Sequence, residues 1–368
     1  MTILYDEMLD QLADLKQIRF KEEIVNGESY TIVSYMIADP KMWSQYPLSL
    51  EARGITFHTE SKEVVCRPFE KFFNLNENEL TQESALDLSK GFYVYDKLDG
   101  SMITPVLLSD ETIRLKTKKS FYSDVAKLAT AEADNKFLDF CKHIITRYNA
   151  TPIFEFISPK NRIVIKYPED QYPFVLLAIR DMESGQYMHI SDVVRIAAEW
   201  DMWTTNHSVQ FSLSNLDTIK EELSDIQDFE GYVIELESTG QRVKMKSDWY
   251  MRNHRVTEIT ERGLAEMVCD ETLDDILPMI KELQLDDKKL NDIIDRVIND
   301  FNQINQTIDL FDYTIDDRKA FAIQYKDHHY FPLAIQKYTG HDPDVKRFWK
   351  KHFLKTFYST EPVYSFGE

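Results

Sequence analysis

The pattern of apolar residues changes near residue 250, and this change limits the folds that the chain can adopt. Up to about residue 247, short runs rich in Val, Ile, Tyr and Phe are bounded by polar turns, which is typical of β-strands. After about residue 250 such runs almost disappear, and apolar residues recur at i, i+3, i+4 and i+7, as in amphipathic helices. We therefore expect two domains, residues 1–254 with α and β structure and residues 255–368 with helices alone.

The expected strands are not separated by regular helices. We therefore expect an α+β first domain with antiparallel β-sheets and flanking helices, rather than a doubly wound parallel sheet. The runs that predict strands are residues 30–35, 54–58, 91–96, 151–157, 162–167, 173–179, 231–236 and 242–246.

Helical spacing of Leu4, Met8, Leu12 and Leu15 predicts that the chain opens with an amphipathic helix. In the last predicted helix, Asp342 is expected as the N-cap, with Pro343 in the first turn. Further helices are predicted over residues 123–148, 191–200, 273–285, 290–304 and 344–357.

Composition excludes several classes of protein. With 43% hydrophobic residues the chain can bury a core, so it is not disordered overall. Its net charge of −20 excludes a uniformly basic surface but allows a local basic cleft. Cys66, Cys141 and Cys269 lack CxxC spacing, which argues against a cysteine zinc site and a disulfide framework. An acidic N-terminus and the lack of a run of about 18 apolar residues indicate a cytoplasmic protein without a membrane segment.

The motif that carries the most chemistry is Lys97-Leu98-Asp99-Gly100-Ser101, directly after the predicted strand 91–96. Asp-Gly favours a tight turn, so the Lys97 amine is expected to lie at a strand end and point into a cleft over the sheet. Alone, the motif is equally compatible with a surface hairpin and a solvated lysine.

Four other elements place charged residues in β-rich runs. They are Glu51-Ala52-Arg53-Gly54, Phe154-Glu155-Phe156, Glu230-Gly231-Tyr232-Val233 and Lys244-Met245-Lys246. Each could be a hydrogen-bonded core residue or a solvated strand face. Charged residues are costly to bury unless paired, however, so five such sites in one domain favour a functional site.

Taken in order, these motifs resemble the covalent nucleotidyltransferase superfamily, which contains ATP-dependent polynucleotide ligases and mRNA capping enzymes. Residues 70–78, 159–164 and 244–250 are similar to the tRNA-repairing RNA ligases of T-even bacteriophages, the RNA ligase 1 family. The resemblance covers residues 30–250. It implies an adenylyltransferase domain followed by a helical domain that contributes to tRNA specificity, and it implies a phage source.

The resemblance further implies that Lys97 attacks the α-phosphate of ATP to form lysyl-AMP. The AMP then moves to an RNA 5′-phosphate, and a 3′-hydroxyl displaces it. An amine attacks only when it is unprotonated, and free lysine has a pKa near ~10.4. We expect partial burial and the charges of Lys244 and Lys246 to lower the pKa of Lys97.

The remaining roles also follow the resemblance. Lys244 and Lys246 would act in catalysis with Lys97 by holding the ATP phosphates, and Arg53 would contact phosphate. Glu155 would bind the ribose or orient metal-bound water, and Glu230 would bind Mg²⁺ or Mn²⁺. The other residues expected at the nucleotide site are Tyr35, Lys71, Phe73, Gly100, Lys118, Gly231 and Tyr250.

RNA binding by an acidic protein requires local basic patches. The last predicted helix contributes to RNA docking, or it presents a solvated face while Phe348 and Trp349 fill the core. Residues 286–317 are acidic and are expected to face solvent away from RNA. The basic clusters are Lys116, Lys118 and Lys119; Lys160, Arg162 and Lys166; and Lys346, Arg347, Lys350, Lys351 and Lys355.

The leading hypothesis is a monomeric ATP-dependent RNA ligase that repairs tRNA broken in the anticodon loop. A DNA ligase or capping enzyme is the alternative within the superfamily, but these usually carry an OB-fold after the lysine pair. A non-catalytic RNA-binding protein is a second alternative. A P-loop ATPase is excluded because the chain has no GxxxxGK[ST] segment.

Overall fold

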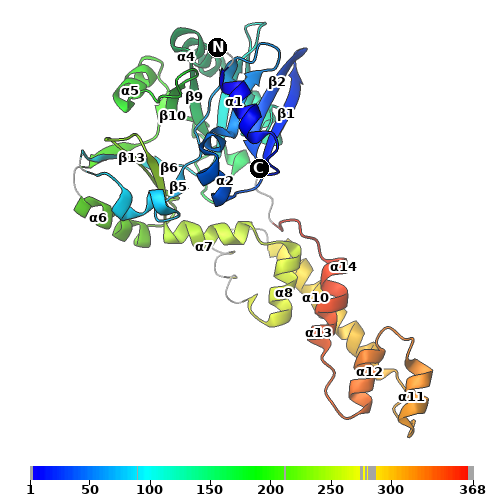
Figure 1. Ribbon diagram of the computed structural model, residues 1–368. Helices are drawn as coiled ribbons and strands as arrows, with labels where there is room; N and C mark the ends of the chain where they lie inside the picture. Colours follow the sequence, from blue (N-terminus) through cyan, green and yellow to red (C-terminus); the bar gives the residue numbers. More distant parts are fainter. Residues whose placement is uncertain are drawn as a thin grey trace. The chain divides into compact units, whose positions relative to one another are not determined.

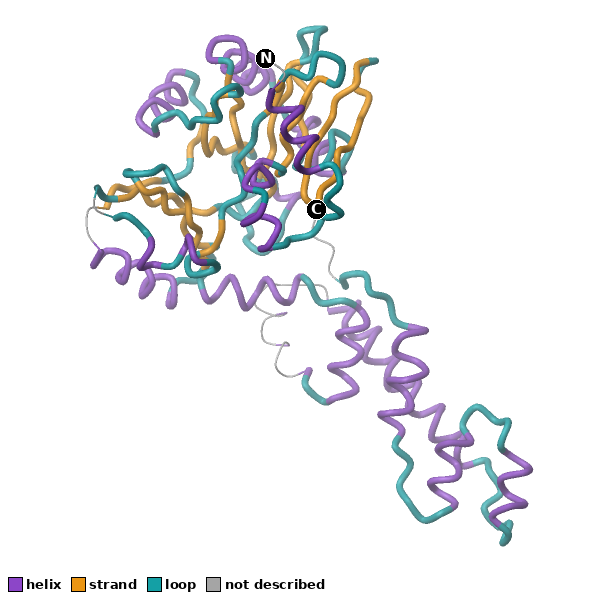
Figure 2. The backbone as a smooth tube through the Cα atoms, in the orientation of Figure 1, coloured by secondary structure: helices purple, strands orange, loops and turns teal. Residues whose placement is uncertain are grey.

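The protein consists of two compact units, which meet in sequence between Met251 and Arg252 (Figure 1). Its computed structural model describes residues 3–88, 90–210, 213–273, 277, 280 and 287–363. All named strands belong to the first unit, whereas the described elements of the second unit are helices (Figure 2). The expected boundary between residues 254 and 255 falls inside helix α7 (Asp248–Thr257).

Three sheets form the first unit. Their strand orders are β1-β2-β3-β4, β11-β10-β9-β7-β8 and β12-β6-β13-β14-β5. Strand β11 runs parallel to β10 and β5 parallel to β14, while the other neighbours are antiparallel, which confirms the expected α+β class. The strands are β1 (Ile18–Val25), β2 (Glu28–Tyr35), β3 (Arg53–His58), β4 (Val64–Cys66), β5 (Phe73–Asn74), β6 (Phe92–Lys97), β7 (Ser101–Leu107), β8 (Ile113–Lys116), β9 (Ala150–Phe156), β10 (Phe174–Asp181), β11 (Trp203–Thr204), β12 (His207–Gln210), β13 (Gly231–Leu236) and β14 (Arg242–Lys246).

Amphipathic helices cover the outer faces of these sheets. The largest core lies where helices pack on the sheet that contains β9 and β10, and there Phe137 stacks on Phe174 with ring centroids 3.9 Å apart. Burying one such side chain stabilises the fold by roughly 1.5–3 kcal/mol. The helices of the first unit are α1 (Ile3–Leu12), α2 (Pro40–Gln45), α3 (Asp124–Glu132), α4 (Asn135–Tyr148), α5 (Ile190–Glu199), α6 (Leu213–Asp225) and the start of α7.

Seven of the eight predicted runs form strands, and the prediction for residues 162–167 is wrong. This segment is irregular because its backbone amides bind a side chain instead of a neighbouring strand. The amides of Val164 and Ile165 each donate to Asp99 Oδ2 at 2.7 Å. A β-rich composition does not form a strand when the amides are taken in this way.

Two helix predictions need correction. Residues 123–148 form two helices, because Asp134 interrupts the run and caps α4 by accepting a hydrogen bond from the Phe137 amide. The last helix is capped by Asp344, which accepts from the Arg347 amide, and not by Asp342. The helix therefore begins after Pro343, with Val345 as its first residue and Asp344 as its N-cap.

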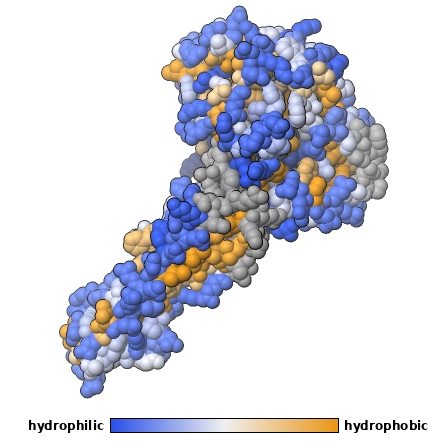
Figure 3. Space-filling view, turned by 180° about the vertical axis from the view of Figure 1, so that it is seen from behind, coloured by the Kyte–Doolittle hydropathy of each residue, from blue (hydrophilic) through white to orange (hydrophobic). Residues whose placement is uncertain are grey.

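The second unit is built around one long helix. Residues 290–304 were predicted as helical and lie inside α10, whereas most of the predicted helix 273–285 lies outside the described residues. On the face seen in Figure 3, apolar surface gathers along this unit, where exposed apolar residues include Ile298, Leu310 and Phe357. The elements after α7 are α8 (Glu261–Asp270), α10 (Asp287–Asp309), α11 (Arg318–Tyr325), α12 (Phe331–Tyr338), α13 (Val345–Trp349), a π-helical turn (Lys350–Leu354) and α14 (Lys355–Phe357).

A membrane-spanning helix would need a long apolar run. None of the helices in the described ranges is both long and apolar enough for this.

Candidate active site

Lys97 is the last residue of β6, and the strand register brings it close to Lys246. Gly231 of β13 pairs with Lys97 on one side and with Lys246 of β14 on the other. Gly231 has a φ of +147°, and a Cβ there would lie 2.0 Å from the Met245 carbonyl oxygen. Only glycine fits this position, so its lack of a side chain lets the two lysine strands approach.

Glu230 joins the two lysines through one carboxylate oxygen. Its Oε1 lies 2.7 Å from Lys97 Nζ and 3.3 Å from Lys246 Nζ, and its side chain is only 3% exposed. Burial lowers the pKa of Lys97, but the charges of Glu230 and Glu155 outweigh this and raise it above the usual lysine value. The expected lowering of the Lys97 pKa is therefore wrong for the protein without nucleotide, because a buried carboxylate is the nearest charge.

The turn after Lys97 is fixed by Asp99, which is 2% exposed. Besides the two amides of residues 164 and 165, its carboxylate accepts a 2.6 Å hydrogen bond from the Tyr250 hydroxyl. The next residue, Gly100, lies against β9, where a Cβ would come within 2.4 Å of the Phe156 carbonyl oxygen. The Asp-Gly pair therefore packs the turn after Lys97 directly on the strand that carries Glu155.

Glu155 is the second carboxylate near Lys97. It lines the same pocket, and no hydrogen-bond or ion-pair partner for it occurs among the residues that the structure describes. Burial raises the pKa of Glu155 to about 8, against the opposing effect of the Lys97 charge. The group is thus a carboxyl that changes protonation near neutral pH and has free oxygens for a ligand.

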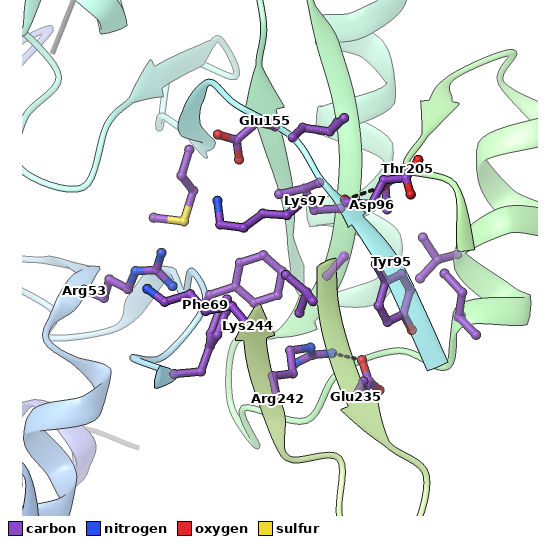
Figure 4. A pocket seen from close by; sticks show the side chains of 18 of the residues that line it. Arg53, Phe69, Tyr95, Asp96, Lys97, Glu155, Thr205, Glu235, Arg242 and Lys244 are labelled. Atoms are coloured by element: carbon purple, nitrogen blue, oxygen red, sulfur yellow. Dashed lines mark hydrogen bonds and ion pairs between the residues drawn. The ribbon is translucent and has the colours of Figure 1, made fainter. Parts of the chain in front are cut away.

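A pocket of about 180 Å³ lies between the two five-stranded sheets (Figure 4). Figure 4 shows the Lys97 side chain pointing toward the space between Arg53 and Glu155, with Lys244 nearby. The charged part of its lining consists of Arg53, Asp96, Lys97, Glu155, Glu235, Arg242, Lys244 and Lys246. The apolar part is formed by Phe69, Phe72, Tyr95, Leu98, Met102, Leu177, Ala178, Met188, Ile190, Val193 and Val233.

Four cations in or beside the pocket have no acidic partner among the described residues. No ion pair with a carboxylate is found for Arg53, Lys71, Lys118 or Lys244 within the described ranges. Burial, followed by the neighbouring positive charges, lowers the pKa of Lys244 to about 7 and that of Lys118 to about 8. A group of partly buried cations without counter-charges has the electrostatic character that suits a polyanion.

Aromatic rings support these cations outside the pocket lining. Lys118 Nζ lies 4.2 Å from the Tyr35 ring centroid, and Lys71 Nζ lies 4.6 Å from that of Phe73. Lys246 Nζ similarly lies 4.7 Å from the Tyr250 ring centroid. Tyr35, Phe73 and Tyr250, which were predicted for the nucleotide site, are therefore not part of the pocket lining. Their rings instead hold the three lysines by cation–π contacts.

One residue of the predicted basic clusters is misplaced. Lys116 is fully buried and donates a 2.8 Å hydrogen bond to the Gly54 carbonyl, so it is not part of an exposed basic patch. The sequence LKTKKS could not distinguish it from Lys118, because residues two apart would lie on the same face of a continued strand, whereas β8 ends at Lys116 and Lys118 lies in the bend that follows.

Sequence reasoning also missed part of the pocket. Glu235 and Arg242 face each other across the β13–β14 pair, form a 2.6 Å ion pair and line the pocket. Arg242 lies 3.7 Å above the Tyr187 ring. A hairpin register counted back from Gly231 and Lys246 would have paired Glu235 with Arg242, but nothing in the sequence indicates Tyr187.

The fold is that of a ligase nucleotidyltransferase domain with a helical region after it. An archaeal ATP-dependent RNA ligase, form 1, is similar with a TM-score of 0.51 over 82% of each chain, at 12% identity. This likeness shows the fold alone.

A family model described as RNA ligase matches residues 51–250, which is more than half of the chain. The chain therefore belongs to the RNA ligase family, as the motifs predicted. A candidate RNA ligase of Thermovibrio ammonificans is 28% identical over 293 residues, 74% of this chain and 73% of that protein. RNA ligase 1 of bacteriophage TS2126 is 26% identical over 262 residues, which cover 68% of this chain and 63% of the phage protein.

Proposed function

We propose that the protein is an ATP-dependent RNA ligase that joins 5′-phosphate and 3′-hydroxyl ends through a lysyl-AMP intermediate on Lys97. One observation carries the proposal: a lysine amine enters a pocket with apolar side chains on one side and, on the other, cations that have no carboxylate partner among the described residues. Such a pocket suits a triphosphate joined to a base. The names of the archaeal and phage proteins support ATP as the co-substrate and RNA as the substrate.

The nucleotide would bind with its phosphates among Arg53, Lys244 and Lys246. Its base would lie on the apolar side, against Tyr95 and Val233. Because Lys244 carries a pKa of about 7, incoming phosphate would favour its charged form and so gain a cation at the moment of binding.

The first step forms a bond between Lys97 Nζ and the α-phosphorus and breaks the bond from that phosphorus to the bridging oxygen of pyrophosphate. Before the attack, the ammonium must lose one proton and leave its ion pair with Glu230. Lys244 and Lys246 would neutralise the charge that develops on the phosphate oxygens. In later steps AMP passes to an RNA 5′-phosphate and is displaced by a 3′-hydroxyl.

The residues fit a magnesium or manganese ion that is held mainly by phosphate and water. Within the described ranges, no group of three or more His, Cys, Asp or Glu side chains could hold a metal by itself. Mg²⁺ often uses only one or two carboxylates beside substrate phosphates, and the Glu155 oxygens have no other partner among the described residues. Glu230 is already bound to two lysines, so Glu155 is the better ligand. Such an ion would withdraw charge from the phosphates when bound.

We further propose that the RNA is tRNA broken in the anticodon loop, sealed by a monomer in the host cytoplasm. The second unit would contact it through Arg347, Lys351 and Lys355, which recur every four residues along the last helix. No ion pair is found for these three in the described part of the chain, whereas Lys346 pairs with Glu271 and Lys350 with Asp270. An unpaired row of this kind matches a phosphate backbone.

The alternatives fit the geometry less well. A DNA ligase or capping enzyme usually carries an OB-fold after the lysine pair, but the named elements described after β14 are helices. A non-catalytic RNA-binding protein would not need Lys97 and Lys246 to meet at one carboxylate oxygen of Glu230.

Labelling with α-³²P-ATP and Mg²⁺ tests the function. We expect acid-labile, alkali-stable label on the full-length protein, none on Lys97→Ala, and normal label on Lys127→Ala, an exposed lysine. Label from GTP would favour a capping enzyme, and label on Lys97→Ala would reject the mechanism. Sealing of nicked anticodon stem-loops against nicked DNA then tests the substrate.

A further inference from the structure

A buried charge network next to the pocket has no role in the chemistry proposed above. At its centre is Glu51, which is 9% exposed and lies two residues before Arg53. Its Oε1 lies 2.8 Å from a guanidinium nitrogen of Arg67 and 2.8 Å from one of Arg180, which are themselves buried. Burial raises the pKa of the Glu51 carboxyl, but the charges of Arg180 and Arg67 outweigh this and lower it.

The two arginines extend the network to the chain segment that carries Phe69, Lys71 and Phe72. Arg180 Nη1 donates to the carbonyl of Pro68 at 2.6 Å. Arg67, which begins this segment, donates to the carbonyl of Glu183 at 2.8 Å. Residues 67–73 are therefore fixed at their start by the guanidinium groups that Glu51 binds.

The same segment is tied back to the residues on each side of Glu51. The Lys71 amide donates to the Leu50 carbonyl at 2.8 Å, and Arg53 Nη1 donates to the Glu70 carbonyl at 3.2 Å. Residues 50–53 and 67–73 are thus joined by these two hydrogen bonds, by the ion pair of Glu51 with Arg67, and by the path from Glu51 through Arg180. If the central carboxylate were lost, two buried guanidinium groups would be left with less counter-charge.

Arg53 depends on this junction because its own side chain makes no ion pair within the described part of the chain. Its guanidinium is placed by the Glu70 carbonyl and by the Phe72 ring, whose centroid lies 5.2 Å away. Both contacts belong to residues 67–73. A shift of this segment would therefore move Arg53 away from the phosphate side of the pocket.

We infer that Glu51 is a positioning residue for nucleotide binding, because it acts through Arg67 and Arg180 to hold Arg53 and residues 67–73 at the pocket wall. The inference rests on the proposed use of ATP in this pocket. Glu51 itself touches no substrate in this scheme. Because Glu51 affects ATP binding, its loss changes the KM for ATP more than the adenylylation rate at saturating ATP.

The test is the kinetics of Lys97 adenylylation in full-length Glu51→Gln, which keeps the side-chain volume but removes the charge. We expect the KM for ATP to rise about tenfold, while the rate at saturating ATP changes by less than about threefold. Asp300→Asn is the matched control: it removes a carboxylate that accepts from Trp349 and Tyr358 in the second unit, and its KM should be unchanged. Arg180→Lys keeps the positive charge but loses the planar guanidinium that binds Glu51 and the Pro68 carbonyl together. It should therefore reproduce the KM rise even if Glu51→Gln does not fold.

A double variant separates positioning from general destabilisation. If Glu51 acts through Arg53, then Glu51→Gln raises the KM of the Arg53→Ala protein by no more than about twofold, since coupled sites are not additive. A full tenfold rise on the Arg53→Ala background would overturn the inference. An unchanged KM in Glu51→Gln and in Arg180→Lys would do the same. A wild-type protein that forms no lysyl-AMP would instead refute the proposed function.

Discussion

The charge state of Lys97 is set by Glu230 more than by the surrounding lysines. The family resemblance implied that these residues share one site, and the strand register does bring Lys97, Glu230 and Lys246 together. The sequence could not give the direction of the Lys97 pKa shift, which depends on a 2.7 Å contact between residues far apart in the chain. Distances of this kind come from strand register.

We expect single-turnover adenylylation at saturating ATP to become faster as the pH rises above 7, because the pKa of Lys97 is raised and the neutral amine is scarce. In Glu230→Gln the carboxylate that raises this pKa is absent, so the increase of the adenylylation rate should occur at lower pH. The measurement is a pH–rate profile for both proteins. Identical profiles would contradict the role of the ion pair.

Lys244 should destabilise the nucleotide-free protein. Its pKa of about 7 lies below the usual 10.5, so between these values the unfolded chain binds more protons and stability increases with pH. The loss of unfolding free energy caused by Lys244 is thus greatest below pH 7 and disappears above about pH 10.5. We expect Lys244→Met to raise the free energy of unfolding at pH 7 by about 1–2 kcal/mol, and by less at pH 10. Urea unfolding at the two pH values measures this, and a gain that does not depend on pH would contradict it.

At the scale of elements, composition predicted strands well where the backbone has a neighbouring strand to bind. Residues 242–246 form β14 with the expected bounds, but residues 162–167, which are also rich in strand-forming residues, bind Asp99 instead. Strand β7 was missed because it follows the nucleophile turn with polar Ser101 and contains Pro105. The strand preference of single residues cannot predict such tertiary contacts.

The last helix was predicted either to contribute to RNA docking or to present a solvated face while its aromatic residues fill the core. Phe348 and Trp349 are buried, so they belong to the core of the second unit. Its charges divide into the paired Lys346 and Lys350 and a row, Arg347, Lys351 and Lys355, without ion pairs in the described ranges, a division that spacing alone could not reveal. Within the acidic stretch, Asp300 is also an exception to the expected solvent exposure, since it accepts hydrogen bonds from Trp349 and Tyr358.

We expect the triple variant Arg347→Gln, Lys351→Gln, Lys355→Gln to bind tRNA more weakly. The slope of log K against log salt should fall in magnitude by about two to three, since up to three phosphate contacts are lost. The matched control is Lys346→Gln with Lys350→Gln, whose lysines already pair with acidic residues of α8 and its end. Equal losses of tRNA affinity in both variants would contradict the assignment.

At the scale of the whole molecule, the change of sequence pattern near residue 250 matches the end of the first unit at Met251. Every residue that lines the pocket lies before this point, and Tyr250 holds Asp99 from the start of α7. The tasks that we propose for the two units, adenylylation and tRNA choice, should therefore be separable.

A protein that consists of residues 1–258 keeps α7 intact and should form lysyl-AMP at a rate within about threefold of the full chain. It should lose the preference for nicked tRNA over nicked linear RNA, because the proposed contacts of the last helix are missing. Competition sealing of the two RNAs measures the preference. A truncated protein that is folded by circular dichroism but cannot be labelled would show that the units act together.

The ion pair of Lys97 with Glu230 also decides which lysines meet foreign electrophiles. Acylating reagents consume free amines, and an ammonium held by a carboxylate offers no lone pair. The ligase at rest should thus keep its nucleophile shielded from metabolic acyl donors, while Lys244 and Lys118 take up such adducts first. Peptide mapping after brief acetylation would reveal this order, and damage of that kind would block the phosphate side while leaving the amine of residue 97 unmodified.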